Sequence, residues 1–392
     1  MKMLSFAVAL QVGIRHVAAF STSNVVGITG SNAASRSAMT RCFSTMRPID
    51  SGVSRVETLQ FLLSKHGAPG SAGCKEANDL ESIASIDDAE LLNLHPHLHP
   101  IARSKSTGNY ICALRRAFAE EGASSTMYAS SNKAPWPIVE TKLGGMGMKV
   151  LALNSEHLMR RIVCECDFAG TGDEIIASYN EGLGQEQLND AALDIPYQRG
   201  SVEKLGYGVD KYVLLKVGPF SDIYESLALG HAKGGDESSS LISAEAANGK
   251  MTGFGSTFRF YARLLRSFPN REEEARDAAR MCLRLPLPSI GMEMDDFREV
   301  AVLGQLAEDA DSDDDVRSKL QSMYQSYVDH EKDDPHASQG KTPESMAIDE
   351  ANYLIDTTAL KGGEWKEIRS DLAKIYSSVG YNEMAKFVDP SL

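Results

Sequence analysis

The sequence predicts a mainly α-helical protein with a small α/β element and a multi-helical C-terminal half. From residue 256 onward, apolar residues recur at the three- and four-residue spacing of a helix face. Residues 148–153 (MKVLAL) read as a buried strand that runs directly into a helix. No apolar run reaches the ~18 residues of a membrane-spanning helix. Hydrophobic residues make up 42% of the chain, which is enough to build a core.

Three helices are expected before residue 124. Residues 54–66 (SRVETLQFLLSKH) are apolar on one side, and a stretch that holds Gly and Pro follows and ends the helix. Residues 79–93 predict a second helix, and residues 110–121 (YICALRRAFAEE) predict a third, closed by Gly122. The Ser-rich stretch 124–137, which holds two prolines, is expected to be a linker.

The α/β element is centred on the strand expected at 148–153. Asn154 or Ser155 can cap the helix expected at 156–166, because a side-chain oxygen there accepts a backbone N–H of the first turn. Residues 211–217 (KYVLLKV) fit either a second strand or a short buried helix, since a short apolar run does not separate the two.

The C-terminal half is predicted to be a series of helices separated by Pro and Gly. Pro343 suits the first turn of a helix, where its missing N–H has no partner to lose. Asn270, with Glu273 three residues later, resembles a capping box. The expected helices are 256–267, 270–285, 344–360, 364–378 and 382–388.

A chain of 392 residues is too long for one ordinary domain, so two or three small domains are expected. The predicted division is a signal peptide at 1–20, a transit peptide at 21–48, a small helical region at 50–123, the linker at 124–137, a small α/β region at 138–235 and a helical C-terminal domain at 250–392.

The first 48 residues have the composition of a two-part targeting presequence. Lys2 precedes an apolar stretch, 3–14, of signal-peptide size, and residues 21–48 are rich in Ser and Thr and hold no acid. The junction AAFS, with Ala19 and Phe20 at its centre, resembles the bipartite presequences of algae such as diatoms, whose plastids lie inside an endomembrane. This resemblance implies cleavage at Ala19 and Phe20 and delivery to a plastid. A plain secretory or mitochondrial presequence is the alternative.

The net charge argues against nucleic acid as a partner, and the cysteine content argues against a disulfide framework. The formal net charge is −14, and removing residues 1–48, which carry five bases and no acid, leaves −19. Phosphate backbones repel a chain this acidic, so nucleic acid is not an expected partner. The six cysteines are irregularly spaced, and one of them lies in the presequence, so a disulfide framework is not expected.

Histidines concentrate in the segment HPHLHP at 95–100, which holds three of the nine. In an extended segment, His95, His97 and His99 would point the same way and could meet one metal ion. The two prolines favour a surface turn instead, and no Cys or acid is fixed nearby. Neither a metal site nor a cofactor is therefore expected.

Six arginines of the C-terminal half form the candidate ligand- or partner-binding site. Three lie along the helix expected at 256–267, and three recur every four residues on the next helix. They could bind an anionic ligand or partner. The alternative is pairing with nearby acids and with the stretch 293–350, which has 17 acids and five bases. The six are Arg259, Arg263, Arg266, Arg276, Arg280 and Arg284.

Other motifs do not meet the requirements of a known site. Cys164 and Cys166 would point about 200° apart on a helix, so core thiols are expected rather than a metal or redox pair. The glycines of 144–147 precede the strand, whereas a phosphate-binding loop needs them after it. The run 309–315 resembles a calcium loop but lacks the required Gly and Glu. The signatures G-x-S-x-G, H-E-x-x-H and C-x-x-C are absent.

Three C-terminal segments carry a resemblance: 260–285 (FYARLLRSFPNREEEARDAARMCLRL), 342–356 (TPESMAIDEANYLID) and 372–388 (LAKIYSSVGYNEMAKFV). Together they resemble the C-terminal region of a plastid-targeted protein family of plants and algae without established catalytic residues. The resemblance covers roughly the last 140 residues and implies a plastid location. The last segment is also similar to a single tetratricopeptide hairpin, although no period of ~34 residues recurs. The matching positions are Ala373, Tyr376, Gly380 and Ala385.

These observations predict a soluble plastid protein, in the stroma or on the stromal face of the thylakoid, that acts by binding other proteins. Assembly or maintenance of photosystems or other thylakoid complexes is the expected role, and catalysis is not expected. The alternative is a plastid enzyme, or a binder of a small anionic ligand, that uses the arginine-bearing helices. Peripheral attachment to the thylakoid is compatible with either function.

Overall fold

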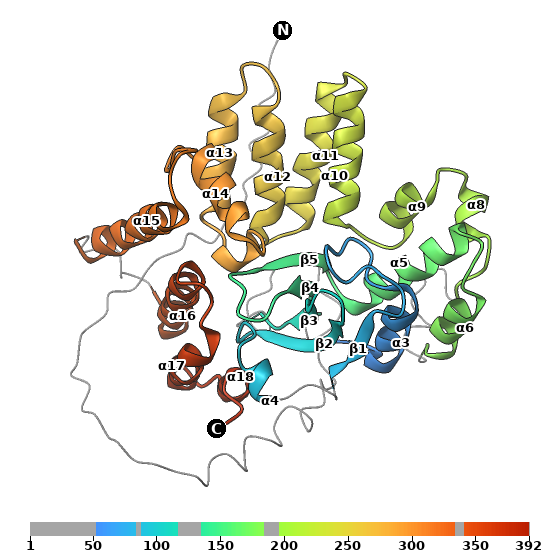
Figure 1. Cartoon of the computed structure of the whole chain (residues 1–392), viewed down its shortest axis with the longest axis horizontal. Helices are drawn as coiled ribbons and strands as arrows, with labels where there is room; N and C mark the ends of the chain where they lie inside the picture. The colour runs from blue at the N-terminus through green and yellow to red at the C-terminus, as the bar shows by residue number, and fades with distance from the viewer. Residues whose placement is uncertain (1–51, 84–87, 117–134, 184–195, 334–340, 392) are drawn as a thin grey trace.

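The structure is a computed structural model that describes residues 52–83, 88–116, 135–183, 196–333 and 341–391. The predicted presequence and most of the predicted linker lie outside these residues. The described chain is mainly helical, with one five-stranded antiparallel sheet, and its C-terminal half is built of helices (Figure 1). The predicted fold class is therefore confirmed.

The sheet is a meander in which strands adjacent in sequence are adjacent in space. Its central strand, β3, is buried on both faces, because Ile111 and Ala113 belong to one hydrophobic core and Tyr110 and Cys112 to another. The strands are β1 (Leu80–Ser82), β2 (Leu98–Ser104), β3 (Tyr110–Leu114), β4 (Ile138–Thr141) and β5 (Met148–Ala152).

The helix predicted from residue 110 is wrong, because β3 stands there. A strand covered on both faces is apolar at every position, so it loses the alternation that would reveal a strand. The helix predicted at 79–93 is also largely wrong, since this segment holds β1 and only the short α4 (Asp88–Leu91). The region predicted to be helical at 50–123 therefore contains three strands.

One face of the sheet is covered by α3 (Val56–His66) and α5 (Ser155–Phe168). Both helices and the strand β5 were expected from the sequence. The Asn154 side chain caps α5 by accepting a hydrogen bond from the His157 backbone N–H at 2.7 Å. The segment 211–217, predicted to be either a strand or a short buried helix, lies almost entirely in a helix. The surrounding helices are α6 (Asp173–Glu181), α8 (Ser201–Leu205) and α9 (Val209–Lys216).

Four helices stand side by side above the sheet (Figure 1). They are α10 (Ser221–Lys233), α11 (Glu237–Lys250), α12 (Gly255–Arg266) and α13 (Glu272–Cys282). The 3-10 turn η2 (Leu287–Ser289), α14 (Met294–Leu303) and α15 (Asp313–Asp333) follow. The capping box predicted at Asn270 is wrong. This residue has a left-handed φ of 61°, and the N-cap of α13 is Arg271, which makes no side-chain cap.

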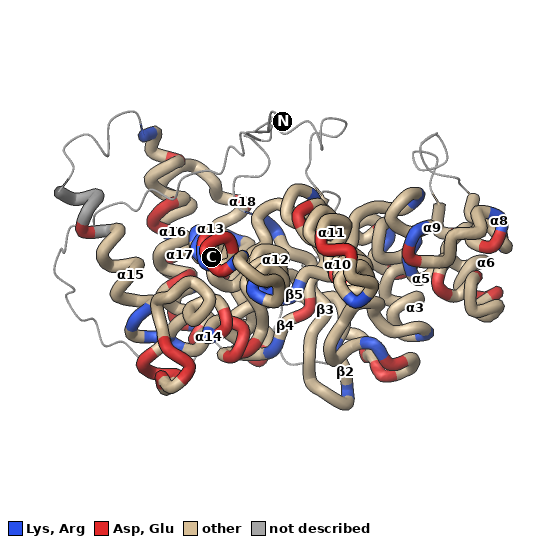
Figure 2. Tube along the Cα trace, turned by 90° about the horizontal axis from the view of Figure 1, so that it is seen from above, with Lys and Arg blue, Asp and Glu red and all other residues tan. Residues whose placement is uncertain are grey.

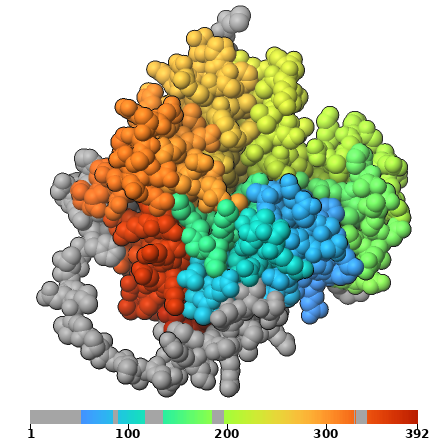
Figure 3. Space-filling model, in the orientation of Figure 1, coloured from blue at the N-terminus to red at the C-terminus, as the bar shows by residue number. Residues whose placement is uncertain are grey.

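The last three helices were expected from the sequence and form a core of their own. They are α16 (Pro343–Leu360), α17 (Trp365–Ser378) and α18 (Asn382–Val388). Pro343 is the first residue of α16, and Thr342 Oγ1 accepts a hydrogen bond from the Ser345 N–H. This C-terminal unit lies against the sheet region and the preceding helices (Figure 3).

The glycine-rich turn between β4 and β5 is a junction between distant parts of the chain. The Gly145 carbonyl accepts a hydrogen bond from Trp365 Nε1 at 2.8 Å, which ties the turn to α17. A Cβ atom at Gly147 would lie 2.3 Å from the Gly291 carbonyl oxygen and 2.4 Å from that of Pro288. The sequence run 144–147 therefore permits close backbone packing against the η2 region.

Glu140 on β4 is a fully buried carboxylate that fastens the loop after α3. It accepts hydrogen bonds from the N–H groups of Ala72 and Gly73, both at 2.7 Å, and from Asn109 Nδ2 at 2.6 Å.

Replacing Glu140 with glutamine is expected to lower the free energy of unfolding by about 2 kcal/mol. The amide –NH₂ replaces one acceptor oxygen, so one N–H donor is left without a partner. Urea unfolding monitored by circular dichroism measures this change. Glu203→Gln, at an exposed position on α8, is the control and should change stability by less than about 0.5 kcal/mol. Equal stability of the two variants would contradict the structural role of Glu140.

Candidate partner-binding groove

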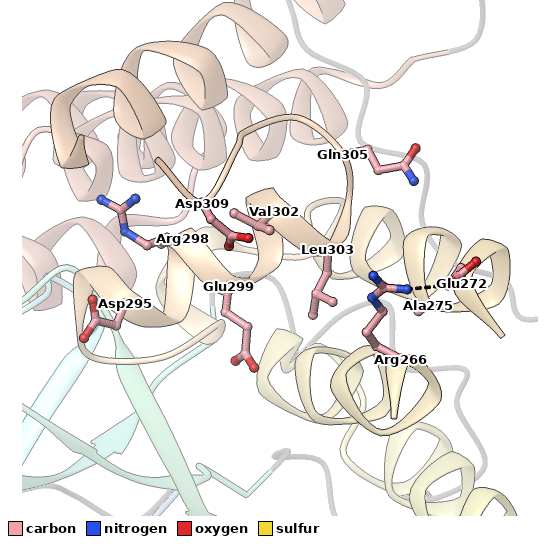
Figure 4. A pocket seen from close by; sticks show the side chains of 10 residues that line it. All are labelled: Arg266, Glu272, Ala275, Asp295, Arg298, Glu299, Val302, Leu303, Gln305 and Asp309. Atoms are coloured by element: carbon pink, nitrogen blue, oxygen red, sulfur yellow. Dashed lines mark hydrogen bonds and ion pairs between the residues drawn. The ribbon is translucent and has the colours of Figure 1, made fainter. Parts of the chain in front are cut away.

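An open groove of about 800 Å³ lies between the α12–α13 connection on one side and α14 with its following loop on the other (Figure 4). Arg266 and Glu272 lie at one end, and Asp295 and Arg298 lie toward the other. The lining residues are Arg266, Glu272, Ala275, Asp295, Arg298, Glu299, Val302, Leu303, Gln305 and Asp309.

The groove wall on α14 follows from helical spacing. Asp295, Glu299, Val302 and Leu303 fall on one face because they recur at intervals of three and four residues. Phe297, Val300 and Ala301 occupy the opposite face and are fully buried in the helical core. The helix thus presents a stripe that is acidic at its start and apolar at its end.

Contacts at both ends hold α14 in place. At its start, the Glu293 side chain and the Asp296 side chain form a reciprocal capping box. At its end, Arg280 Nε donates to the Gly304 carbonyl oxygen at 3.1 Å, and Gln305 turns the chain with a left-handed φ of 58°. The groove is therefore framed by a rigid helix.

The two arginines of the groove are already occupied. Arg266 pairs with Glu272 at 2.7 Å, and Arg298 pairs with Asp313 at 2.5 Å. Asp295 and Asp309 make no ion pair with any other residue that the structure describes. Acidic residues are concentrated along the chain beside α14 (Figure 2). The groove therefore offers carboxylates rather than cations to a partner.

The six arginines predicted to form a binding site do not converge on one place. Four of them, Arg259, Arg263, Arg266 and Arg276, form ion pairs with acids, and Arg266 alone lines the groove. Arg280 holds the end of α14, and Arg284 Nη1 donates a weak hydrogen bond to Met281 Sδ at 3.9 Å. Burial lowers the pKa of Arg259, while the carboxylate of Glu299 acts in the opposite direction. This arrangement resembles the predicted alternative, in which the arginines pair with nearby acids, more closely than a site that binds an anion.

The histidine segment lies inside the protein, so the surface turn predicted at 95–100 is wrong. The His95 ring packs 4.6 Å from the ring of Trp365, and His97 Nε2 shares a 2.7 Å hydrogen bond with the Tyr376 hydroxyl. Both histidines are buried where the loop before β2 meets α17. Sequence spacing could not reveal this, because both aromatic partners lie more than 200 residues away.

Burial lowers the pKa of His97 to about 3, and the nearby Arg369 and Arg115 act in the same direction. Burial also lowers the pKa of His95 well below its usual value, as do His97 and Arg369. In the unfolded chain both imidazoles regain an ordinary pKa near 6.5. The unfolded state therefore binds more protons below pH 6.5, so the stability present above this pH is lost as the pH falls.

The protein is expected to lose about 2 kcal/mol of stability per buried histidine between pH 7 and pH 5. Thermal unfolding across this range measures the loss. His97→Gln cannot be protonated but can still form a hydrogen bond with Tyr376, so its stability should fall less steeply with pH. Parallel pH profiles of the two proteins would contradict this assignment.

The predicted core thiols Cys164 and Cys166 are both buried. Burial raises the pKa of Cys164 to about 12 and that of Cys166 to about 11, so both stay protonated at neutral pH. Within the described ranges, no group of three or more His, Cys, Asp or Glu side chains is placed to hold a metal ion. No helix in this part of the chain is both long enough and apolar enough to cross a membrane.

Comparison with known proteins places these features in a family. Residues 221–307 match the model described as the PAB middle domain, and residues 314–391 match the PAB C-terminal domain. The chain is 30% identical over 257 residues to the Arabidopsis thaliana protein IN CHLOROPLAST ATPASE BIOGENESIS, chloroplastic. This match covers 64% of the chain and 69% of the relative. The chain belongs to this PAB family. No solved structure matches it significantly.

The family match shows in which of the two PAB domains the groove helices lie. Helices α12, α13 and α14 all lie in the PAB middle domain, and α16 to α18 lie in the PAB C-terminal domain. The chloroplastic relative supports the predicted plastid location and the resemblance to a plastid family. The spacing of Asp295, Glu299 and Val302 by four and three residues was the sequence signal that could have revealed this face of α14. The sequence prediction instead chose the regularly spaced arginines of the neighbouring helices.

Proposed function

We propose that this PAB family member is a plastid protein that assists assembly of the chloroplast ATPase by binding its unassembled parts. The observation that carries this proposal is the similarity to a relative named for chloroplast ATPase biogenesis. This similarity extends over 69% of the relative's length. The proposal narrows the role expected from the sequence, which named photosystems and thylakoid complexes in general.

The described structure supports action by protein binding. Its groove combines an apolar strip with carboxylates, as a protein docking surface does. The alternative, a plastid enzyme or small anionic-ligand binder that uses the arginine-bearing helices, needs cationic side chains directed at a ligand. Arg266 and Arg298, the two arginines in the groove, instead pair with carboxylates.

Complementation tests this function. Expressing the full chain in Arabidopsis thaliana plants that lack the matched relative should raise the amount of assembled chloroplast ATPase, measured on native gels. Tagged full chain should also capture ATPase subunits from a chloroplast extract. Full expression in the chloroplast without either effect would remove the proposal.

We further propose delivery to the stroma, or to the stromal face of the thylakoid, through the bipartite presequence at 1–48. A fluorescent full-length fusion in a diatom should accumulate in the plastid. Phe20→Ala should reduce this import, whereas Phe43→Ala, also in the presequence, should not. Washing isolated thylakoids with salt then separates peripheral attachment from a free stromal protein. Secretion of the unaltered fusion would contradict plastid delivery.

A further inference from the structure

We infer that the groove between α12–α13 and α14 is the docking site for a basic amphipathic helix of a client protein. The inference rests on the proposed assembly function and names the chemistry of the segment that is bound. It starts from the shape and the charge of a single surface, which lies in the PAB middle domain except for Asp309 in the loop that follows.

The groove has the layout that an amphipathic helix requires. Val302 and Leu303 are half-buried on α14, and the fully buried Ala275 lies at the base of α13. These side chains give an apolar strip with charged residues along its edges. Amphipathic helices bind such grooves through apolar anchors spaced three or four residues apart.

The charge of the groove selects a basic client. Its lining includes the four carboxylates of Glu272, Asp295, Glu299 and Asp309 and the two guanidinium groups of Arg266 and Arg298. Both guanidinium groups are paired with carboxylates, so Asp295 and Asp309 provide the uncompensated charge among the described residues. Lys and Arg side chains of a docked helix would complete these ion pairs.

Charge beyond the groove reinforces the same choice. The loop after α14 holds the exposed acids Glu308 and Asp309, and the first turn of α15 holds three more, Asp313, Asp314 and Asp315. This acidic surface would attract a basic segment and accelerate its association at low ionic strength. An anionic small molecule or an acidic peptide would be repelled by the same surface.

A designed peptide tests the inference. The probe is a fluorescein-labelled peptide of Leu and Lys, about 18 residues or five helical turns long, with all Leu on one face. Fluorescence anisotropy with the purified full chain should show saturable binding that weakens as salt is raised. A scrambled peptide of the same composition has no apolar face and should bind much more weakly.

Substitutions locate the binding. Asp295→Lys with Asp309→Lys should raise the dissociation constant about tenfold or more, because two attractive charges become repulsive. The control, Glu203→Lys with Glu245→Lys, changes the net charge equally at exposed positions on α8 and α11 and should leave binding nearly unchanged. Asp309→Lys alone, in an exposed loop, keeps the test valid if the double variant is less stable.

The outcomes separate this inference from the proposed function. Equal weakening by both double variants would show general charge attraction and would overturn the groove assignment, as would failure of the amphipathic peptide to bind. If groove variants still capture ATPase subunits as well as the unaltered chain, the groove is not the client site, although the assembly function stands. If the unaltered chain binds the peptide but captures no subunit, the assembly function is contradicted. The groove then still binds a basic amphipathic helix, but the inference that this helix belongs to an ATPase subunit is overturned.

Discussion

Replacing Arg369 with alanine is expected to lower the free energy of unfolding by about 3–5 kcal/mol. The Arg369 side chain is buried and donates to three carbonyl oxygens: Leu92 at 2.9 Å, Leu94 at 2.7 Å and Val388 at 2.7 Å. Two of these carbonyls lie before β2, and the third is at the end of α18. Alanine would leave all three buried without their donor, at about 1–2 kcal/mol each.

Burial lowers the pKa of Arg369 to about 10, so the side chain stays charged at neutral pH. Arg369→Lys should be intermediate in stability, because one ammonium group does not reproduce the planar fork of donors. The control is Lys374→Ala on the same helix, where the lysine is exposed and pairs with Asp371. Urea unfolding and the rate of proteolysis within α16–α18 measure the effect. A loss no larger than that of Lys374→Ala would contradict this account.

The elements that were predicted correctly are those whose signals lie within a few residues. Asn154 caps α5, and Thr342 with Pro343 opens α16, as their residue types required. Gly380 adopts a left-handed φ of 84° at the turn between α17 and α18, which glycine does without steric strain. Local chemistry together with apolar spacing therefore predicted five helices after residue 250, namely α12, α13 and α16 to α18, whereas α14 and α15 were not predicted.

The missed elements depend on contacts between residues far apart in the sequence. β3 reads like a helix because two hydrophobic cores, built from residues 53–223 and 91–254, cover its two faces. His95 and His97 read like a turn because Trp365 and Tyr376, which bury them, come after residue 360. The groove also needed the placement of three helices, because its lining comes from α12, α13 and α14 with the loop that follows it. A pattern within one segment cannot supply it, so the groove emerged only with the three helices in place.

The second large effect is expected at the β4–β5 turn, where Gly147→Ala should lower the free energy of unfolding by about 3 kcal/mol. The added methyl group would lie 2.3 Å and 2.4 Å from two backbone carbonyl oxygens, of Gly291 and Pro288. Backbone atoms cannot rotate away as the end of a side chain can, so the hairpin must move from the η2 region. Urea unfolding measures the loss, and cysteine labelling at Cys282, which is buried nearby in the helical core, reports the loosening.

Gly230→Ala provides a control of opposite sign. Gly230 lies within α10, and apart from the local backbone of that helix no atom of the described residues lies within 4 Å of the site where its Cβ would stand. Alanine there should stabilise the protein by about 0.5–1 kcal/mol, because glycine loses more backbone freedom on entering a helix. If both variants changed stability in the same direction, removal of glycine flexibility would explain the data and the steric role of Gly147 would be wrong. Opposite signs would show that the turn contains glycine for the close approach of two chain segments, which also explains why a glycine run precedes a strand.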